Sequence, residues 1–156
     1  SEAEIAAFES TYQIILPDDV RSYFLKVNGM KKSTEGMDNK MMTFYSLKDV
    51  KPLSKEMEGY EIENAESYFV FADYNITSWY YAVQLSGNTE QPACVFRIDI
   101  DGTLTKLERS FSRFIERYFN EDIIYSTTSI EGEKPLNLTP QENRGCFEKM
   151  FSWLKG

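Results

Sequence analysis

The stretch Tyr68-Phe69-Val70-Phe71-Ala72 is a continuous apolar run made almost entirely of aromatic and β-branched residues. Such a short run, ended by Asp73, is typical of a central strand that is covered on both faces. The next apolar segment, residues 79–85, alternates between two sets of side chains with the period of a strand. Together the two segments predict the centre of a β-sheet.

Two more strands are predicted on the C-terminal side of this pair. Residues 94–100 alternate with period two, Asp101-Gly102 is a hairpin turn signal, and residues 103–107 return as the partner strand. A helix is predicted at 110–119. We expect one side of this helix to be apolar, with Phe111, Phe114, Ile115, Tyr118 and Phe119.

Two helices are predicted before the sheet. The first covers residues 2–12 and has an apolar stripe. The second covers residues 17–28 and begins at Pro17, and Asp18 and Asp19 suit the positive end of its dipole. Its buried face is expected to hold Val20, Tyr23, Phe24 and Val27. Between helix and sheet, a short strand is predicted at 41–45 and a brief helix at 46–50.

This order of elements predicts an α+β fold, with an antiparallel sheet of four to six strands flanked by helices. The length of 156 residues fits a single domain, residues 1–156. A last helix is predicted over 139–155, after the capping box that begins at Thr139. Its apolar stripe is expected to pack on the domain, and an interaction surface is the alternative.

The composition excludes several classes of function. The chain has no histidine, which removes Ser-His-Asp and Cys-His catalysis and histidine metal sites. It has no glycine-rich phosphate loop. Carboxylate-only catalysis stays open on composition, and we expect no cofactor and no metal. The two cysteines, Cys94 and Cys146, are expected to be buried thiols, with a disulfide as the alternative.

Charge and hydropathy indicate where the protein acts and what it binds. The 25 acidic residues outnumber 17 basic ones, giving a formal net charge of −8. Such a field repels nucleic acid and attracts basic partners. No apolar run approaches the roughly 20 residues that cross a bilayer. We expect a cytoplasmic protein, monomeric or weakly dimeric, that binds neither nucleic acid nor membrane.

The candidate partner-binding residues are acidic or aromatic. Five glutamates lie between residues 56 and 66, and the alternatives are a solvated loop or part of an acidic binding face. Asp73 ends a strand, where functional loops commonly begin. Tyr80 is either an exposed anchor or part of a sheet buried on both sides. The predicted set is Asp18, Asp19, Glu61, Glu63, Asp73 and Tyr80, in which Asp18 and Asp19 could serve only their helix.

Several segments in order resemble the SUKH superfamily over roughly residues 5–120. The family has an "LP" with acidic neighbours, an "NG" about ten residues later, a "lyslee" segment, an apolar strand and a closing "SFeeFL". The matching segments are Ile14-Ile15-Leu16-Pro17-Asp18-Asp19-Val20, Asn28-Gly29, Phe44-Tyr45-Ser46-Leu47-Lys48-Asp49-Val50, Tyr68-Phe69-Val70-Phe71-Ala72-Asp73 and Ser110-Phe111-Ser112-Arg113-Phe114-Ile115. The predicted C-terminal helix lies outside this resemblance.

The resemblance implies a function without catalysis, and its motifs supply no catalytic residue, so we expect none. Relatives of this kind are mostly immunity proteins of bacterial toxin systems, and the fungal ones are cell-wall-assembly regulators. We therefore expect a protein partner, namely a basic toxin domain such as a nuclease. The alternative is a regulatory scaffold that binds another protein of its own cell. A third reading, an enzyme with a carboxylate-only site, needs facing carboxylates in a deep pocket.

Overall fold

The computed structural model describes residues 1–30, 37–87, 93–120 and 123. Its centre is a six-stranded antiparallel sheet in the order β1-β3-β4-β5-β6, and β2 pairs with β3 on the edge that β1 also uses. The predicted α+β fold is confirmed. The strands are β1 (Met42–Phe44), β2 (Lys51–Pro52), β3 (Tyr68–Tyr74), β4 (Trp79–Gln84), β5 (Val95–Asp99) and β6 (Leu104–Glu108).

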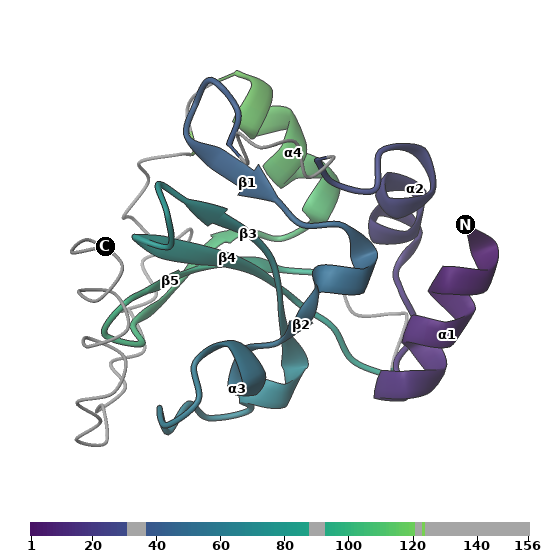
Figure 1. Ribbon diagram of the computed structural model, residues 1–156, viewed down its shortest axis with the longest axis horizontal. Helices are drawn as coiled ribbons and strands as arrows, with labels where there is room; N and C mark the ends of the chain where they lie inside the picture. The colour runs from purple at the N-terminus through teal and green to yellow at the C-terminus, as the bar shows by residue number, and fades with distance from the viewer. Residues whose placement is uncertain (31–36, 88–92, 121–122, 124–156) are drawn as a thin grey trace, which may run out of the picture.

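Helices cover both faces of the sheet. Helices α2 and α4 lie above the sheet in Figure 1, and α3 lies below it. Both the N-terminal helix α1 and the pair α2 and α4 contribute side chains to the same apolar cluster. The helices are α1 (Glu2–Tyr12), α2 (Asp18–Lys26), α3 (Leu53–Glu56) and α4 (Phe111–Phe119), with short 3-10 helices η1 (Leu47–Asp49) and η2 (Ala65–Ser67).

The alternation along the strands divides the core into two clusters. Phe71 of β3 and Phe114 of α4 belong to the larger cluster under the long helices, and their ring centroids lie 5.4 Å apart. Val70 belongs to the second cluster, on the α3 side, together with Leu53. The central run is therefore buried on both faces, as its uninterrupted apolar character predicts.

Asn28 and Gly29 lock the end of α2 onto the segment after β1. The side-chain oxygen of Asn28 accepts a hydrogen bond from the backbone N–H of Leu47 at 2.9 Å. Gly29 has φ +71°, and a Cβ there would lie 2.3 Å from the carbonyl oxygen of Tyr45. Only glycine fits both this conformation and this close approach. Through these two contacts the "NG" pair joins two of the segments that carry the resemblance.

Two predicted core positions are wrong. Val27 is 60% exposed and Phe119 is 71% exposed. Helix α2 ends at Lys26, so Val27 no longer follows the buried face. Phe119 is the last residue of α4 and lies one position beyond Tyr118, at the rim of the buried stripe. The predicted helix 139–155 and Cys146 lie outside the described residues.

Candidate functional site

An acidic segment, residues 56–66, leads from the end of α3 to the start of β3. It has five glutamates and no basic residue. Glu56 is half-buried and its carboxylate lies 2.8 Å from the Lys51 ammonium. The other glutamates are all exposed, namely Glu58, Glu61, Glu63 and Glu66. The segment therefore places four carboxylates in solvent along a short piece of backbone.

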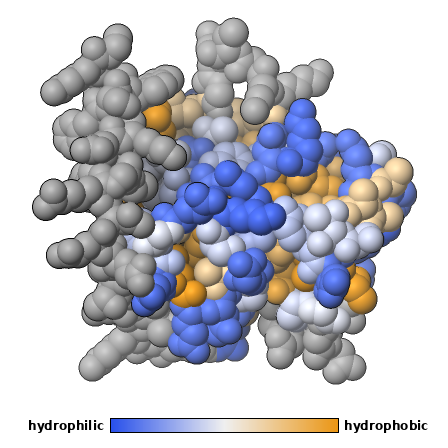
Figure 2. All heavy atoms as spheres, turned by 60° about the horizontal axis from the view of Figure 1, so that its bottom comes forward, coloured by the Kyte–Doolittle hydropathy of each residue, from blue (hydrophilic) through white to orange (hydrophobic). Residues whose placement is uncertain are grey.

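The acidic segment belongs to the side of the sheet that carries α3. Its apolar residues Tyr60 and Ile62 pack against the second cluster, and so hold the segment to the sheet. Burial raises the pKa of Tyr68, the first residue of β3, and the neighbouring Glu63 raises it further. In Figure 2, where this side comes forward, hydrophilic residues lie between apolar ones across the surface.

Asp73 lies on β3 as a buried hydrogen-bond acceptor. Its side chain is 6% exposed. One carboxylate oxygen accepts from the Tyr45 hydroxyl at 2.9 Å, and the other accepts from the backbone N–H of Thr77 at 3.2 Å. Burial raises the pKa of Asp73, and the two hydrogen bonds offset part of that rise. The role of Asp73 in partner binding stays a prediction. Because the side chain is buried, it offers a partner little surface to contact.

Tyr45 is the hydrogen-bond partner of Asp73, and the sequence did not reveal this contact. Burial is the main cause that raises the pKa of Tyr45 above its ordinary range, and the charge of Asp73 adds to the rise. No motif signals this contact, because Tyr45 and Asp73 are 28 positions apart and only the pairing of β1 with β3 brings them together. The pair ties the family-like segment around Tyr45 to the central strand.

Asp18 and Asp19 lie on the opposite side of the sheet from the acidic segment. Asp18 is exposed at the first position of α2. The carboxylate of Asp19 accepts from the backbone N–H of Val20 at 2.9 Å and from that of Ser112 at 3.0 Å. The structure therefore does not bring these two aspartates together with Glu61 and Glu63, and Asp19 has a role within the fold.

Tyr80 is half-buried at the margin of the second core. It pairs across the sheet with Asp73 on one side and with Ile98 on the other. Its ring packs against the second cluster, whereas Trp79 packs against the first. This arrangement matches the alternative of a sheet covered on both faces, and Tyr80 as a binding anchor stays a prediction.

An aromatic stack where β3 ends and β4 begins was also not foreseen from the sequence. The rings of Tyr74 and Trp79 lie parallel, with centroids 4.1 Å apart, and the Arg97 guanidinium lies 4.2 Å from the Trp79 ring centre. Arg97 also forms an ion pair with Asp99 at 2.5 Å. The stack occupies three neighbouring strands, so period-two alternation within any one strand could not reveal it.

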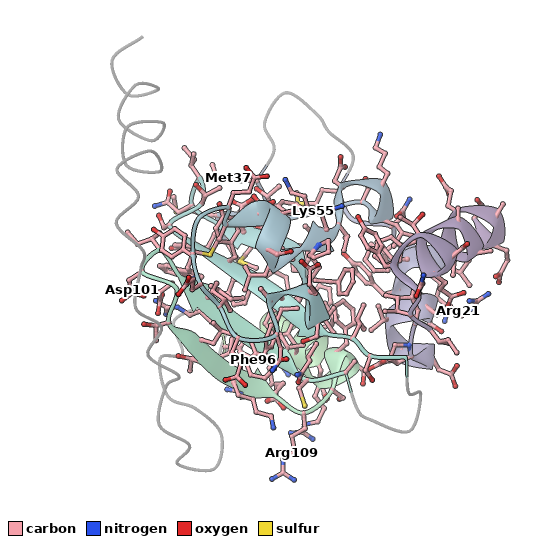
Figure 3. The ribbon with its side chains drawn as sticks, turned by 90° about the horizontal axis from the view of Figure 1, so that it is seen from below. Arg21, Met37, Lys55, Phe96, Asp101 and Arg109 are labelled. Carbon is pink, nitrogen blue, oxygen red and sulfur yellow. The ribbon has the colours of Figure 1, made fainter. Side chains whose placement is uncertain are left out.

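The described part of the chain shows no group of three or more histidine, cysteine or carboxylate side chains placed to hold a metal ion. Figure 3 looks onto the α3 side, with Lys55 of α3 and Phe96 of β5 both in view. Within the described ranges, no helix has the length and apolar character needed to cross a membrane.

The sequence matches the profile of the SMI1 / KNR4 family (SUKH-1) over residues 1–117. The chain belongs to this SUKH-1 family. The matched part includes the Asn28-Gly29 pair, the segment around Tyr45, the central strand β3 and most of α4. No curated protein matches the chain, and no solved structure does. Membership of this family supports an immunity or regulatory role for the domain at the level of the family.

Proposed function

We propose that this SUKH-1 domain, residues 1–156 as one unit, is a non-catalytic immunity protein that neutralises a bacterial toxin by binding it directly. The toxin domain presents a basic surface, such as that of a nuclease. The observation that carries the proposal is the acidic segment, whose exposed glutamates have no basic residue among them. Family membership supports a protein-binding role.

The acidic segment suits recognition of a basic surface for two reasons. Its exposed carboxylates add to a net charge of −8, so the attraction acts before contact and raises the association rate. Its apolar residues Tyr60 and Ile62 pack on the second cluster, so the segment is positioned by the fold. A partner therefore meets carboxylates whose backbone is already held in place.

The test begins with the genes adjacent to this one: the immunity proposal expects one of them to encode a toxin domain, and that domain is purified. Its activity is titrated with increasing amounts of the purified chain. Direct binding predicts that inhibition is complete at one chain per toxin and that no smaller amount gives full inhibition. Full inhibition by a small fraction of one equivalent would indicate catalysis by the chain. Absence of any complex with this toxin would contradict the immunity proposal.

A further inference from the structure

The turn between β3 and β4 keeps three consecutive residues in a conformation that two of them disfavour. Asn75, Ile76 and Thr77 have φ of 44°, 54° and 61°. This left-handed region is unfavourable for β-branched side chains such as those of Ile76 and Thr77. Ile76 is also 61% exposed, so burial of its side chain does not offset the strain. Contacts with the rest of the fold must therefore hold the turn in this form.

Two hydrogen bonds fasten the turn to its surroundings. The turn lies at the end of the sheet where β1 begins and β5 ends (Figure 1). The backbone N–H of Asn75 donates to the carbonyl oxygen of Met41, just before β1, at 2.8 Å. The backbone N–H of Thr77 donates to the side chain of Asp73 at 3.2 Å. Of these two bonds, only the second has an acceptor that can gain or lose charge.

Asp73 joins this turn to the segment after β1. Its other carboxyl oxygen accepts from the Tyr45 hydroxyl at 2.9 Å, and its side chain is 6% exposed. When the carboxyl is ionised, it accepts both bonds. When it is protonated, its own O–H can donate to the Tyr45 oxygen, while its carbonyl oxygen still accepts from Thr77. Both forms of Asp73 therefore keep two hydrogen bonds, and they differ in charge.

The surroundings of Asp73 oppose a negative charge. The titratable groups that face it are Tyr45 after β1, Tyr80 on β4 and Glu56 on α3. None of these groups carries a positive charge. Lys51 on β2 is engaged by Glu56, with 2.8 Å between ammonium and carboxylate. Among the residues that the structure describes, no lysine or arginine forms an ion pair with Asp73.

Opening of the turn favours the ionised form of Asp73. A carboxylate that is removed from water without a positive partner is destabilised, and water that enters beside an open turn solvates it. The neutral carboxyl gains much less from that water. Burial accordingly raises the pKa of Asp73, the bonds from Tyr45 and Thr77 offset part of the rise, and the charge of Glu56 adds to it. The closed turn thus holds the neutral form better than the open turn does.

We propose that Asp73 is a pH-dependent clasp, which keeps the β3–β4 turn closed while its carboxyl is neutral and releases the turn more readily once it is ionised. The preference for the closed turn is fully present below pH 3.8, the ordinary pKa of the group, and is lost as the pH rises through the pKa in the closed form. Strain at Ile76 and Thr77 favours opening at every pH, so the charge on Asp73 sets how often the turn opens. The clasp belongs to the fold and is independent of the partner proposed above.

The first test follows hydrogen exchange of single backbone amides in the full chain by NMR, from acid to neutral pH. Rates are expressed as protection relative to the intrinsic rate at each pH. The Thr77 amide is expected to lose protection as the pH rises. Gly102 is the matched control, because its N–H closes the β5–β6 turn on the carbonyl oxygen of Asp99 at 2.9 Å, without a buried carboxyl. Protection of Thr77 that does not change with pH, or that changes equally at Gly102, would overturn the proposal.

The second test replaces the groups that set the charge. Asp73→Asn cannot ionise but can still accept from Thr77 and donate to Tyr45, so the protection of Thr77 should stay constant with pH. Glu56→Gln should move the midpoint of the loss to lower pH, because the charge of Glu56 opposes ionisation of Asp73.

Glu66→Gln is the matched control for Glu56→Gln. It removes the same charge at an exposed glutamate and should leave the midpoint in place. Because Glu56→Gln keeps Asp73 and both of its bonds, it tests the clasp even where Asp73→Asn disturbs the fold. A loss of Thr77 protection that persists in folded Asp73→Asn, or equal midpoints for the two glutamine variants, would show that Asp73 is not the clasp.

Discussion

The carboxylate of Asp19 accepts a hydrogen bond at 3.0 Å from the backbone N–H of Ser112, which is 93 positions away in the sequence. Ser112 lies in the first turn of α4, whose N-cap Ser110 accepts from the N–H of Arg113. Since the first four N–H groups of a helix lack partners within it, Asp19 and Ser110 satisfy two different ones. Asp19 thereby joins the start of α2 to the start of α4.

Replacement of Asp19 by alanine is expected to lower the free energy of unfolding by about 1–2 kcal/mol, because α4 loses a cap and its link to α2. Asp18→Ala is the matched control and should cost less than about 0.5 kcal/mol, since Asp18 is exposed. Urea denaturation measures both. Equal losses for the two variants would show that the contact with Ser112 contributes nothing.

Phe71→Ala and Phe114→Ala should each cost about 3–5 kcal/mol in denaturant melts. Phe71 is 1% exposed and Phe114 is 0% exposed, and their rings meet between β3 and α4. Phe119→Ala, which removes the same side chain at a position 71% exposed, serves as the comparison and should cost under about 1 kcal/mol. A loss below about 1 kcal/mol for either buried phenylalanine would contradict this account of the core.

Asp73 should make the stability of the protein depend on pH. Burial raises the pKa of Asp73 above its ordinary value of 3.8, so the folded protein holds the proton more tightly than the unfolded chain does. This contribution to stability is fully present below pH 3.8 and is lost as the pH rises through the folded-state pKa. Asp73→Asn cannot titrate and should not show that loss.

The measurement is the free energy of unfolding of both proteins from acid to neutral pH. Relative to the parent chain, Asp73→Asn should gain stability as the pH rises. Its amide can still accept from Thr77 and donate to the Tyr45 hydroxyl. Asp101→Asn, at an exposed aspartate, is the control and should follow the parent curve. Parallel curves for the parent chain and Asp73→Asn would contradict a raised pKa.

Reversal of Glu61 and Glu63 to lysine should slow association with a basic toxin about three- to tenfold at low salt. The double reversal changes the net charge from −8 to −4, since each substitution adds two positive charges. Glu2→Lys with Glu116→Lys makes the same change at exposed positions elsewhere and should slow association less. Stopped-flow rates over a range of salt give the comparison.

Stability and salt dependence provide the check on this prediction. The Glu61 and Glu63 reversals should change the free energy of unfolding by under about 0.5 kcal/mol, because exposed charges contribute little to folding. The difference between the variants should disappear at high salt, where screening shortens the field. An association rate that does not change with salt would exclude electrostatic steering by this segment.

Ile76→Gly should stabilise the protein. A left-handed conformation costs about 1–2 kcal/mol for a residue with a side chain, and glycine avoids that cost while it loses more backbone freedom on folding. We expect a net gain of about 0.5–1 kcal/mol by urea denaturation. Val27→Gly, at a similarly exposed residue with φ −111°, should instead lose stability. A loss for Ile76→Gly would show that the turn is not strained.

Much of the architecture follows from local pattern. The change from period two to helical spacing predicts β3, β4 and α4 within one or two residues of their observed ends, because each is long enough to show its period. The two-residue strand β2 and the four-residue helix α3 were not predicted, since neither is long enough to show a period. Val27 was misplaced because apolar character alone does not show where a helix ends, and Phe119 because it does not show how wide the buried stripe of a helix is.

The candidate site residues also fall into two groups: those whose exposure the sequence predicts and those whose contacts it does not. The exposure of Glu61 and Glu63 agrees with the polar composition of their segment, which has few apolar residues to bury. By contrast, Asp18 and Asp19 look equivalent in the sequence, yet only Asp19 has an observed bond to α4. That difference depends on the packing of two helices far apart in the chain.

The sequence by itself determined the α+β class, the central strand and the acidic character of residues 56–66, because these depend on composition and on the spacing of neighbouring residues. Only the tertiary structure decided that Asp73 is buried against Tyr45, that Asp19 caps α4, and that Met41, Ile76 and Ile100 lie along one end of the sheet. The physical reason is that burial, hydrogen-bond partners and surface neighbours are set by strand pairing and helix packing, which join residues that no local pattern connects.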